Sequence, residues 1–165
     1  MAAEFTDAIA LLKADHRKVE DLFDKFEAAS GRSRGGLAQQ ICDELKIHTA
    51  IEEEIFYPAL KGQIEADTLQ EAYVEHDGAK VLINDILANG PDDEFFAAKV
   101  KVLSEEIKHH VHEEEMPKEG MFAQAREAGV DLVALRDRMA ARKDELKAQA
   151  EGAGLPPAEL RVVAA

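Results

Sequence analysis

Four histidines and two glutamates are the residues of this chain best suited to chemistry. Each stands where the periodicity of an amphipathic segment calls for an apolar core residue. The six are His16, His48, Glu52, His76, His110 and Glu114. A single histidine on an apolar face is usually a packed core residue, but here four separate segments share the feature. Because an ionised carboxylate in a helical core is unfavourable unless it is paired or coordinated, the pattern indicates a buried metal site.

Both glutamates follow a histidine by four residues, as His48–Glu52 and His110–Glu114. Residues four apart share one helical face, so each pair can offer an imidazole and a carboxylate to one centre. With the other two histidines, the set is too large for tetrahedral zinc and suits two metals bridged by both glutamates. Nitrogen and oxygen ligands without thiolate favour iron or manganese, with iron preferred. We therefore predict two iron ions, an oxo or hydroxo bridge, and an open position for a small molecule.

Neighbouring residues of the same types compete for these roles. His110 is in register with Leu103 and Ile107, whereas His109 lies at the edge of that stripe and His112 points away. His109 and His112 are left as surface groups or as groups that support the ligands. The same register assigns four further acids to a solvated face, namely Glu53, Glu54, Glu113 and Glu115.

Two other side chains were considered for the site. Tyr73 lies one turn before His76, so its hydroxyl could bond a bridging oxygen, take part in redox chemistry, or simply pack. Cys42 lies off the core-facing stripe and has no partner for a redox pair, so we expect a small buried residue.

Amphipathic helices must position these residues. Periodicity predicts helices at about 5–29 and 37–60. Thr6 or Asp7 can cap the first, the glycine-containing stretch 31–36 stops it, and Pro58 falls in the closing turn of the second. A third helix is expected from the capping box Thr68-x-x-Glu71 to the break at 89–91. A fourth, capped at 92 or 93, carries the stripe from 96 to 114.

Short connections between long consecutive helices favour antiparallel neighbours. The expected fold is therefore all-α, an up-down-up-down four-helix bundle with an additional C-terminal helix. We expect one domain over residues 1–149, with its core at 5–120, the extra helix at about 121–149 packed on the outside, and a flexible tail at 150–165.

The amino-acid composition of the chain excludes some classes of binding partner. Asp and Glu total 34 against 20 Lys and Arg, for a formal charge of -14, so neither nucleic acid nor an anionic membrane surface is expected to bind. The single cysteine excludes an internal disulfide, and no stretch approaches 18 apolar residues. The N-terminal residues do not have the pattern of a signal peptide, so the expected location is cytoplasmic.

The chain resembles the hemerythrin-like, or HHE cation-binding, family of bacterial proteins. Four stretches between about residues 10 and 126 carry the resemblance, namely LKADHRKVEDLF, ELKIHTAIEEEIFYPAL, EHDGAK and IKHHVHEEEMPKEGMF. The resemblance implies a non-haem di-iron centre with the four histidines as terminal ligands and Glu52 and Glu114 as bridges. Members of that family bind oxygen, sense oxygen or iron, or handle peroxide or nitric oxide.

The chain departs from the oxygen-carrying hemerythrins of invertebrates at two positions. They have a further histidine one turn after the third-helix ligand, where this chain has Lys80, and an aspartate bridge where it has Glu114. One iron would thus have more room for external ligands, and Lys80 could pair with a carboxylate. Our expectation is a protein that binds O2, peroxide or NO for sensing, binding or storage. The alternative is a di-iron enzyme acting on peroxide, nitric oxide or ferrous iron, and the sequence does not identify a protein partner.

Overall fold

A computed structural model describes residues 4–164, and over that range it contains only helices and connecting segments. The ends of the predicted domain and tail, residues 1–3 and 165, lie outside the described residues. In chain order the elements are α1 (Ala8–Ala28), α2 (Ser33–Ile51), the π-helix η1 (Glu52–Phe56), α3 (Tyr57–Leu60), α4 (Ala66–Asn89), α5 (Phe96–Glu115), α6 (Met121–Glu127) and α7 (Leu132–Glu151).

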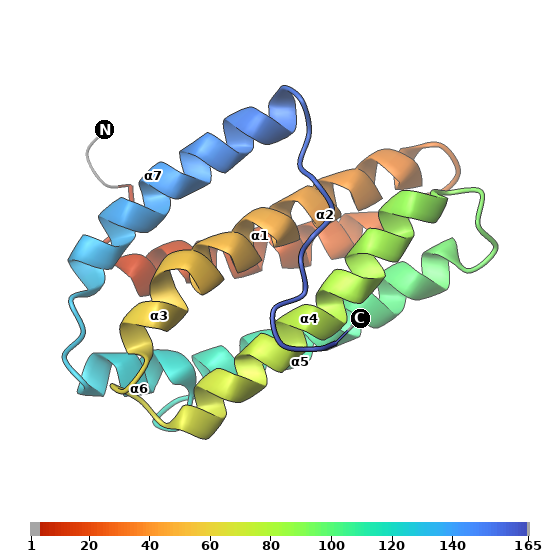
Figure 1. Ribbon diagram of the computed structural model, residues 1–165. Helices are drawn as coiled ribbons and strands as arrows, with labels where there is room; N and C mark the ends of the chain where they lie inside the picture. Colours follow the sequence, from red (N-terminus) through yellow and green to blue (C-terminus); the bar gives the residue numbers. More distant parts are fainter. Residues whose placement is uncertain (1–3, 165) are drawn as a thin grey trace.

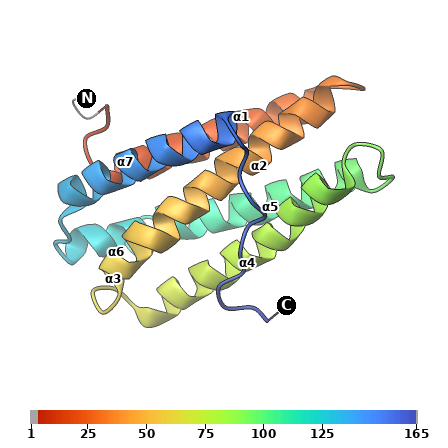
Figure 2. The same cartoon turned by 45° about the horizontal axis from the view of Figure 1, so that its top comes forward.

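The bundle consists of two helical hairpins (Figures 1 and 2). Helix α1 packs against α2, α4 packs against α5, and α2 also contacts α4. The predicted all-α four-helix bundle is confirmed, and α7 packs on its outside against α1 and α2. Four chain segments therefore face a common interior.

Local signals explain the first hairpin. The side chain of Asp7 caps α1 by accepting a hydrogen bond of 2.9 Å from the N–H of Ala10. Helix α1 ends at Ala28, and Gly31 has a φ of 57° in the short connection that follows. The expectation that the whole stretch 31–36 stops the helix was too broad, because α2 already begins at Ser33.

The second segment contains a π-helix that the periodicity did not reveal. Pro58 has no N–H for the carbonyl of Glu54, and its ring would crowd that carbonyl in a regular helix. The N–H of Tyr57 bonds instead to the carbonyl of Glu52, five residues back. This wider turn moves Tyr57 to the face of the helix that carries Glu52.

The starts of the second hairpin's helices differ from the prediction. Helix α4 begins at Ala66, so Thr68 is not its cap, and its hydroxyl accepts a hydrogen bond from Gln124. Asp93 bonds the N–H of Phe95 and so stabilises the turn that precedes α5. Gly90, with a φ of 72°, ends α4 as expected.

The C-terminal part differs in two respects. The single helix expected at 121–149 is two helices, α6 and α7, separated by a turn in which Gly129 has a φ of 74°. The residues expected to form a flexible tail run instead as an extended, non-helical segment from α7 across α2 to α4 (Figures 1 and 2). We call residues 155–163 of this segment the strap.

The apolar core falls into two clusters separated by a polar layer. In α1, Leu12 belongs to one cluster and Val19 to the other, with His16 between them. In α4, Ala72 and Ala79 are divided in the same way by a histidine. The four helices therefore place one apolar cluster on each side of the histidines, and the histidines lie in the layer between the two clusters.

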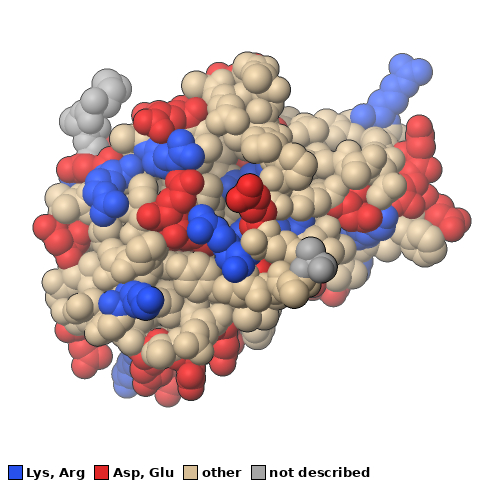
Figure 3. All heavy atoms as spheres, in the orientation of Figure 1, with Lys and Arg blue, Asp and Glu red and all other residues tan. Residues whose placement is uncertain are grey.

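The surface is strongly but not uniformly charged. On the face in Figure 3, Lys and Arg side chains lie beside Asp and Glu rather than in one continuous basic patch. None of the helices in residues 4–164 has the length and apolarity needed to cross a membrane.

Candidate metal centre

The six residues singled out from the sequence meet inside the bundle. All are buried, and Glu52 is 0 % exposed. They form two groups of three residues. Within each group, one nitrogen or oxygen atom of each residue lies within 4.8 Å of those of the other two. The first contains His16, His48 and Glu114, and the second contains Glu52, His76 and His110. Each group draws its histidines from two helices, so the site depends on the tertiary fold.

Each glutamate joins the two groups. Glu52 Oε1 is 2.9 Å from His48 Nε2 and 3.2 Å from His76 Nε2. Glu114 Oε1 is 3.3 Å from His16 Nε2 and 3.4 Å from the Nε2 of His110. A carboxylate that faces one histidine of each group is placed to bridge two metals.

Several of these buried atoms lack a hydrogen bond to any residue in 4–164. They are His16 Nε2, His48 Nε2, both carboxylate oxygens of Glu52, and Glu114 Oε1. Unsatisfied buried polar atoms are rare because each one destabilises the fold. Metal–ligand bonds of about 2.0–2.2 Å place neighbouring ligands about 3 Å apart, which matches the separations above. The donor set therefore fits a pair of metal ions.

The outer ring nitrogens of the four histidines also point to metal. Each Nδ1 lies beside a carboxylate, in the pairs His16–Glu115 at 2.5 Å, His48–Asp15 at 3.0 Å, His76–Glu53 at 2.7 Å and His110–Glu75 at 2.8 Å. Such pairs fix the proton on Nδ1 and leave the Nε2 lone pair free for a metal.

Two of the assignments from sequence are corrected by these contacts. Glu53 and Glu115 were placed on a solvated acidic face, yet Glu53 is 5 % exposed and both bond a site histidine. Asp15 and Glu75 are two further supporting carboxylates, and the sequence pattern does not single them out. These supporting carboxylates lie beside the apolar stripes, so periodicity gives no signal for them.

The closest histidine pair is His76 and His110, whose Nε2 atoms are 3.1 Å apart. With each Nδ1 proton directed to a carboxylate, two neutral rings would face each other with lone pairs. A cation or an added proton between them removes this repulsion.

Electrostatics in the metal-free site favour such protons. Burial lowers the pKa of His76, but the neighbouring carboxylates of Glu52 and Glu53 outweigh this effect and raise the pKa from 6.5 to about 9. Burial likewise opposes the charge of His48, but Glu52 and Asp15 raise its pKa well above 6.5. Burial raises the pKa of Glu52, but His48 and His76 together more than reverse this effect, so the carboxylate stays ionised.

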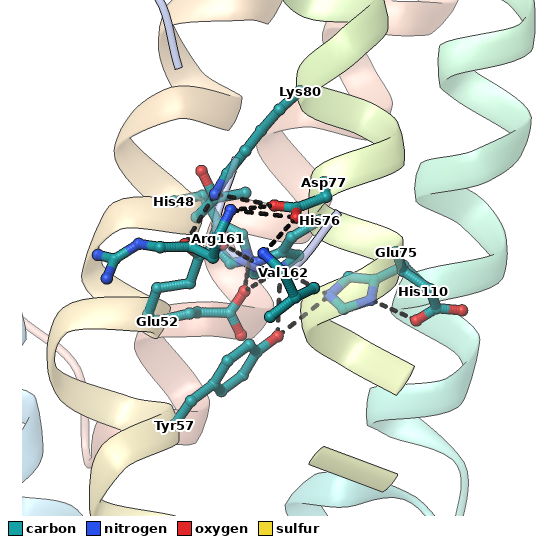
Figure 4. A network of polar contacts seen from close by, with 12 residues as sticks. His48, Glu52, Tyr57, Glu75, His76, Asp77, Lys80, His110, Arg161 and Val162 are labelled. Atoms are coloured by element: carbon teal, nitrogen blue, oxygen red, sulfur yellow. Dashed lines mark hydrogen bonds and ion pairs between the residues drawn. The ribbon is translucent and has the colours of Figure 1, made fainter. Parts of the chain in front are cut away.

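Tyr57 is a site residue that sequence reasoning missed (Figure 4). Its hydroxyl donates to Glu114 Oε2 at 2.9 Å and lies 3.1 Å from His76 Nε2. Tyr73, the tyrosine chosen from sequence, packs edge-on against the ring of Tyr57 at 5.2 Å between ring centroids. The signal that could have found Tyr57 is Pro58, whose π-turn brings the fifth residue after Glu52 to the same face.

The remaining alternatives lie away from the ligand atoms. His109 is 63 % exposed and reaches Glu75, and His112 is exposed. The thiol of Cys42 is buried in an apolar cluster, and burial raises its pKa to about 12. Lys80 is 2.7 Å from Glu53 Oε1, so it pairs with a carboxylate that supports His76.

A family model, the hemerythrin HHE cation binding domain, matches residues 7–122. The chain belongs to the hemerythrin HHE cation-binding family. The matched range contains all six residues of the centre, and the predicted resemblance is confirmed. As a member of this family, the chain is a hemerythrin-like metal-binding protein.

A solved structure extends the match beyond the family model. It is an HHE cation binding domain-containing protein from Mycobacterium kansasii, described as an Rv2633c homolog. The two chains superpose with a TM-score of 0.73 over 92% of this chain and 96% of the other, at 21% identity. This likeness shows the shared fold, including the C-terminal addition to the bundle.

A curated relative is a DNA nickase from Nostoc sp. strain PCC 7120. The match is 29% identical over 106 residues, which is 64% of this HHE protein and 30% of the nickase. This chain therefore matches less than a third of that relative's length.

Proposed function

We propose that this HHE protein is a non-haem di-iron protein that binds O2 or a related small molecule for sensing, binding or storage. The observation that carries the proposal is the set of buried nitrogen and oxygen atoms that lack hydrogen bonds within residues 4–164 and lie about 3 Å apart. One iron would be held by His16 and His48, and the other by His76 and His110. Glu52 and Glu114 would bridge them.

The ligand types favour iron. The set contains imidazoles and carboxylates without thiolate, which suits iron or manganese, and its six residues are too many for tetrahedral zinc. Once bound, the iron pair would supply redox chemistry and open coordination positions for a small ligand.

The space beside the centre supports a small ligand. A cavity of about 10 Å³ is bordered by the four site histidines, by the apolar residues Val19, Leu45, Ile107 and Val111, and by Asp15, Glu44 and Thr49, which turn little polar surface to it. This volume is near the minimum that holds one water-sized molecule, and its apolar wall disfavours water itself. A diatomic molecule fits these properties better than an organic substrate does.

Tyr57 belongs to the apolar cluster on the other side of the histidines from this cavity, and it would hold Glu114 in place from that side. Burial and the charge of Glu114 raise its pKa well above 10, so the phenol keeps its proton and remains a donor to Glu114. This hydrogen bond orients a bridging carboxylate.

The second candidate is an oxidoreductase acting on peroxide, nitric oxide or ferrous iron. Tyr57 favours this candidate as well, because a phenol 3.1 Å from His76 Nε2 can supply a proton or an electron at the centre. The activity of the nickase is not expected of this chain, because a net charge of -14 repels DNA phosphates.

An optical experiment separates the two candidates. The iron-loaded protein is reduced without air, exposed to O2, and returned to vacuum while its visible spectrum is recorded. A band that appears with O2 and disappears under vacuum supports binding. A change that does not reverse supports oxidative chemistry, and the absence of any iron-dependent spectrum contradicts both.

A further inference from the structure

Each carboxylate that supports a site histidine is itself in contact with a basic group. Asp15 contacts Lys143, Glu115 contacts Arg17, Glu53 contacts Lys80 and Arg161, and Glu75 contacts His109. Residues 4–164 thus contain four sets of contacts in which a basic group pairs with a carboxylate and that carboxylate bonds a site histidine. Two of the five basic groups come from beyond residue 122, outside the range that the family model matches.

From these contacts we infer that α7 and the strap are working parts of the metal centre, with Lys143 and Arg161 as positioning residues that slow the loss of metal. This inference rests on the proposed function. It goes beyond that function because it assigns a role to the C-terminal segment, which carries none of the six ligands.

Lys143 is the stronger case. Its side chain is 13 % exposed, and its ammonium contacts Asp15 Oδ1 while Asp15 Oδ2 bonds His48. By contrast, Arg17 beside Glu115 is 56 % exposed, so solvent screens its charge. Without Lys143, the buried carboxylate of Asp15 would keep, among residues 4–164, only the imidazole of His48 as a partner.

The strap reaches the second metal group through Glu53. Arg161 Nε is 3.2 Å from Glu53 Oε1, and the carbonyl of Glu159 accepts a 2.8 Å hydrogen bond from Lys80. Glu53 Oε2 in turn bonds His76. The C-terminal segment therefore contacts a supporting carboxylate of each metal group, Asp15 for the first and Glu53 for the second.

Specific contacts hold the strap in place. The buried carboxylate of Asp77 accepts backbone N–H hydrogen bonds from residues 161, 162 and 163 at 2.7–3.0 Å. Asn84 exchanges two hydrogen bonds with the backbone of Ala158, and Lys46 donates to the carbonyl of Pro156. These contacts bind main-chain groups, so they fix the path of the strap and with it the position of Arg161.

The test measures how fast ferrous iron leaves the reconstituted full-length protein for a coloured ferrous chelator under anaerobic conditions. Lys143→Met should lose iron about tenfold faster, near the lower end of effects seen when groups that orient ligands are removed. Lys143→Arg keeps the charge and should restore a rate close to that of the unmodified chain.

Arg142→Met is the matched control. Arg142 is adjacent on α7 and pairs with Glu54 at 2.8 Å, and Glu54 contacts none of the site histidines within the described residues. Its loss should leave the iron release rate unchanged. Melting of the metal-free variants, recorded in parallel, separates general destabilisation from an effect on the metal.

If Lys143→Met does not fold, the iron release rate of Arg161→Met tests the inference on its own. Because Arg161 is 49 % exposed and Lys80 remains beside Glu53, the expected acceleration is about two- to threefold. The inference is overturned if Lys143→Met, or Arg161→Met in its place, releases iron no faster than Arg142→Met. If the unmodified chain takes up no iron, the proposed function fails and this inference fails with it.

Discussion

Binding of metal to this site should expel protons, and the affinity for ferrous iron should therefore rise with pH. In the metal-free protein, His76 has a pKa of about 9 against its usual 6.5, because Glu52 and Glu53 more than compensate for burial. At pH 7 the ring thus carries a proton on the nitrogen that the metal needs. Well below the pKa, each displaced proton makes the apparent affinity rise about tenfold per pH unit, and the rise levels off at the pKa. His76 alone therefore predicts about a fiftyfold rise in affinity between pH 7 and 9.

The same group makes the metal-free protein less stable at high pH. A pKa raised in the folded state adds stability that is fully present below pH 6.5 and is lost as pH rises to about 9. At about 1.4 kcal/mol per pH unit, the contribution of His76 is about 3 kcal/mol. The difference in melting temperature between metal-loaded and metal-free protein should widen across this window.

Titration calorimetry measures both quantities. Anaerobic ferrous iron is added at several pH values in buffers of different ionisation enthalpy, which gives the affinity and the number of protons released. We expect release of at least one proton per chain at pH 7, falling as pH approaches 9. An affinity that stays constant from pH 6.5 to 9, with no proton release, would refute the reasoning about His76.

Three substitutions test other parts of the account. Tyr57→Phe should lower the stability of the metal-free protein by about 1–3 kcal/mol in denaturant unfolding, because Glu114 loses a buried donor, and an unchanged midpoint would argue against that hydrogen bond. His110→Ala should lower the iron content, whereas His109→Ala should leave it unchanged by elemental analysis, and equal losses would contradict the register. Asp77→Ala should make the strap more susceptible to limited proteolysis, since three backbone N–H groups lose their acceptor, and unaltered cleavage would show that other contacts suffice.

Much of the bundle could be predicted because the candidate metal-binding residues stand at positions where the pattern calls for core residues. His16 and His76 interrupt apolar stripes, so the period that locates the helices also locates these side chains. The choice of His110 over His109 followed from register alone, and the buried position of His110 agrees with it.

The supporting groups could not be predicted in this way. Consecutive helical residues point about 100° apart, so Glu53 was assigned to the surface although it faces α4 and bonds His76. Tyr57 reaches the site only through a π-turn, which shifts the register by one residue. The strap is held by Asp77 through backbone N–H groups, and these leave no trace in residue types.

The most direct test of the central claim is the iron content of the purified, reconstituted protein together with its electron paramagnetic resonance after oxidation in air. Two irons per chain without an isolated high-spin ferric signal are predicted, because two ions bridged by Glu52 and Glu114 as proposed would be coupled magnetically. One iron or fewer per chain, or two irons that give the signal of isolated ions, would contradict a carboxylate-bridged pair.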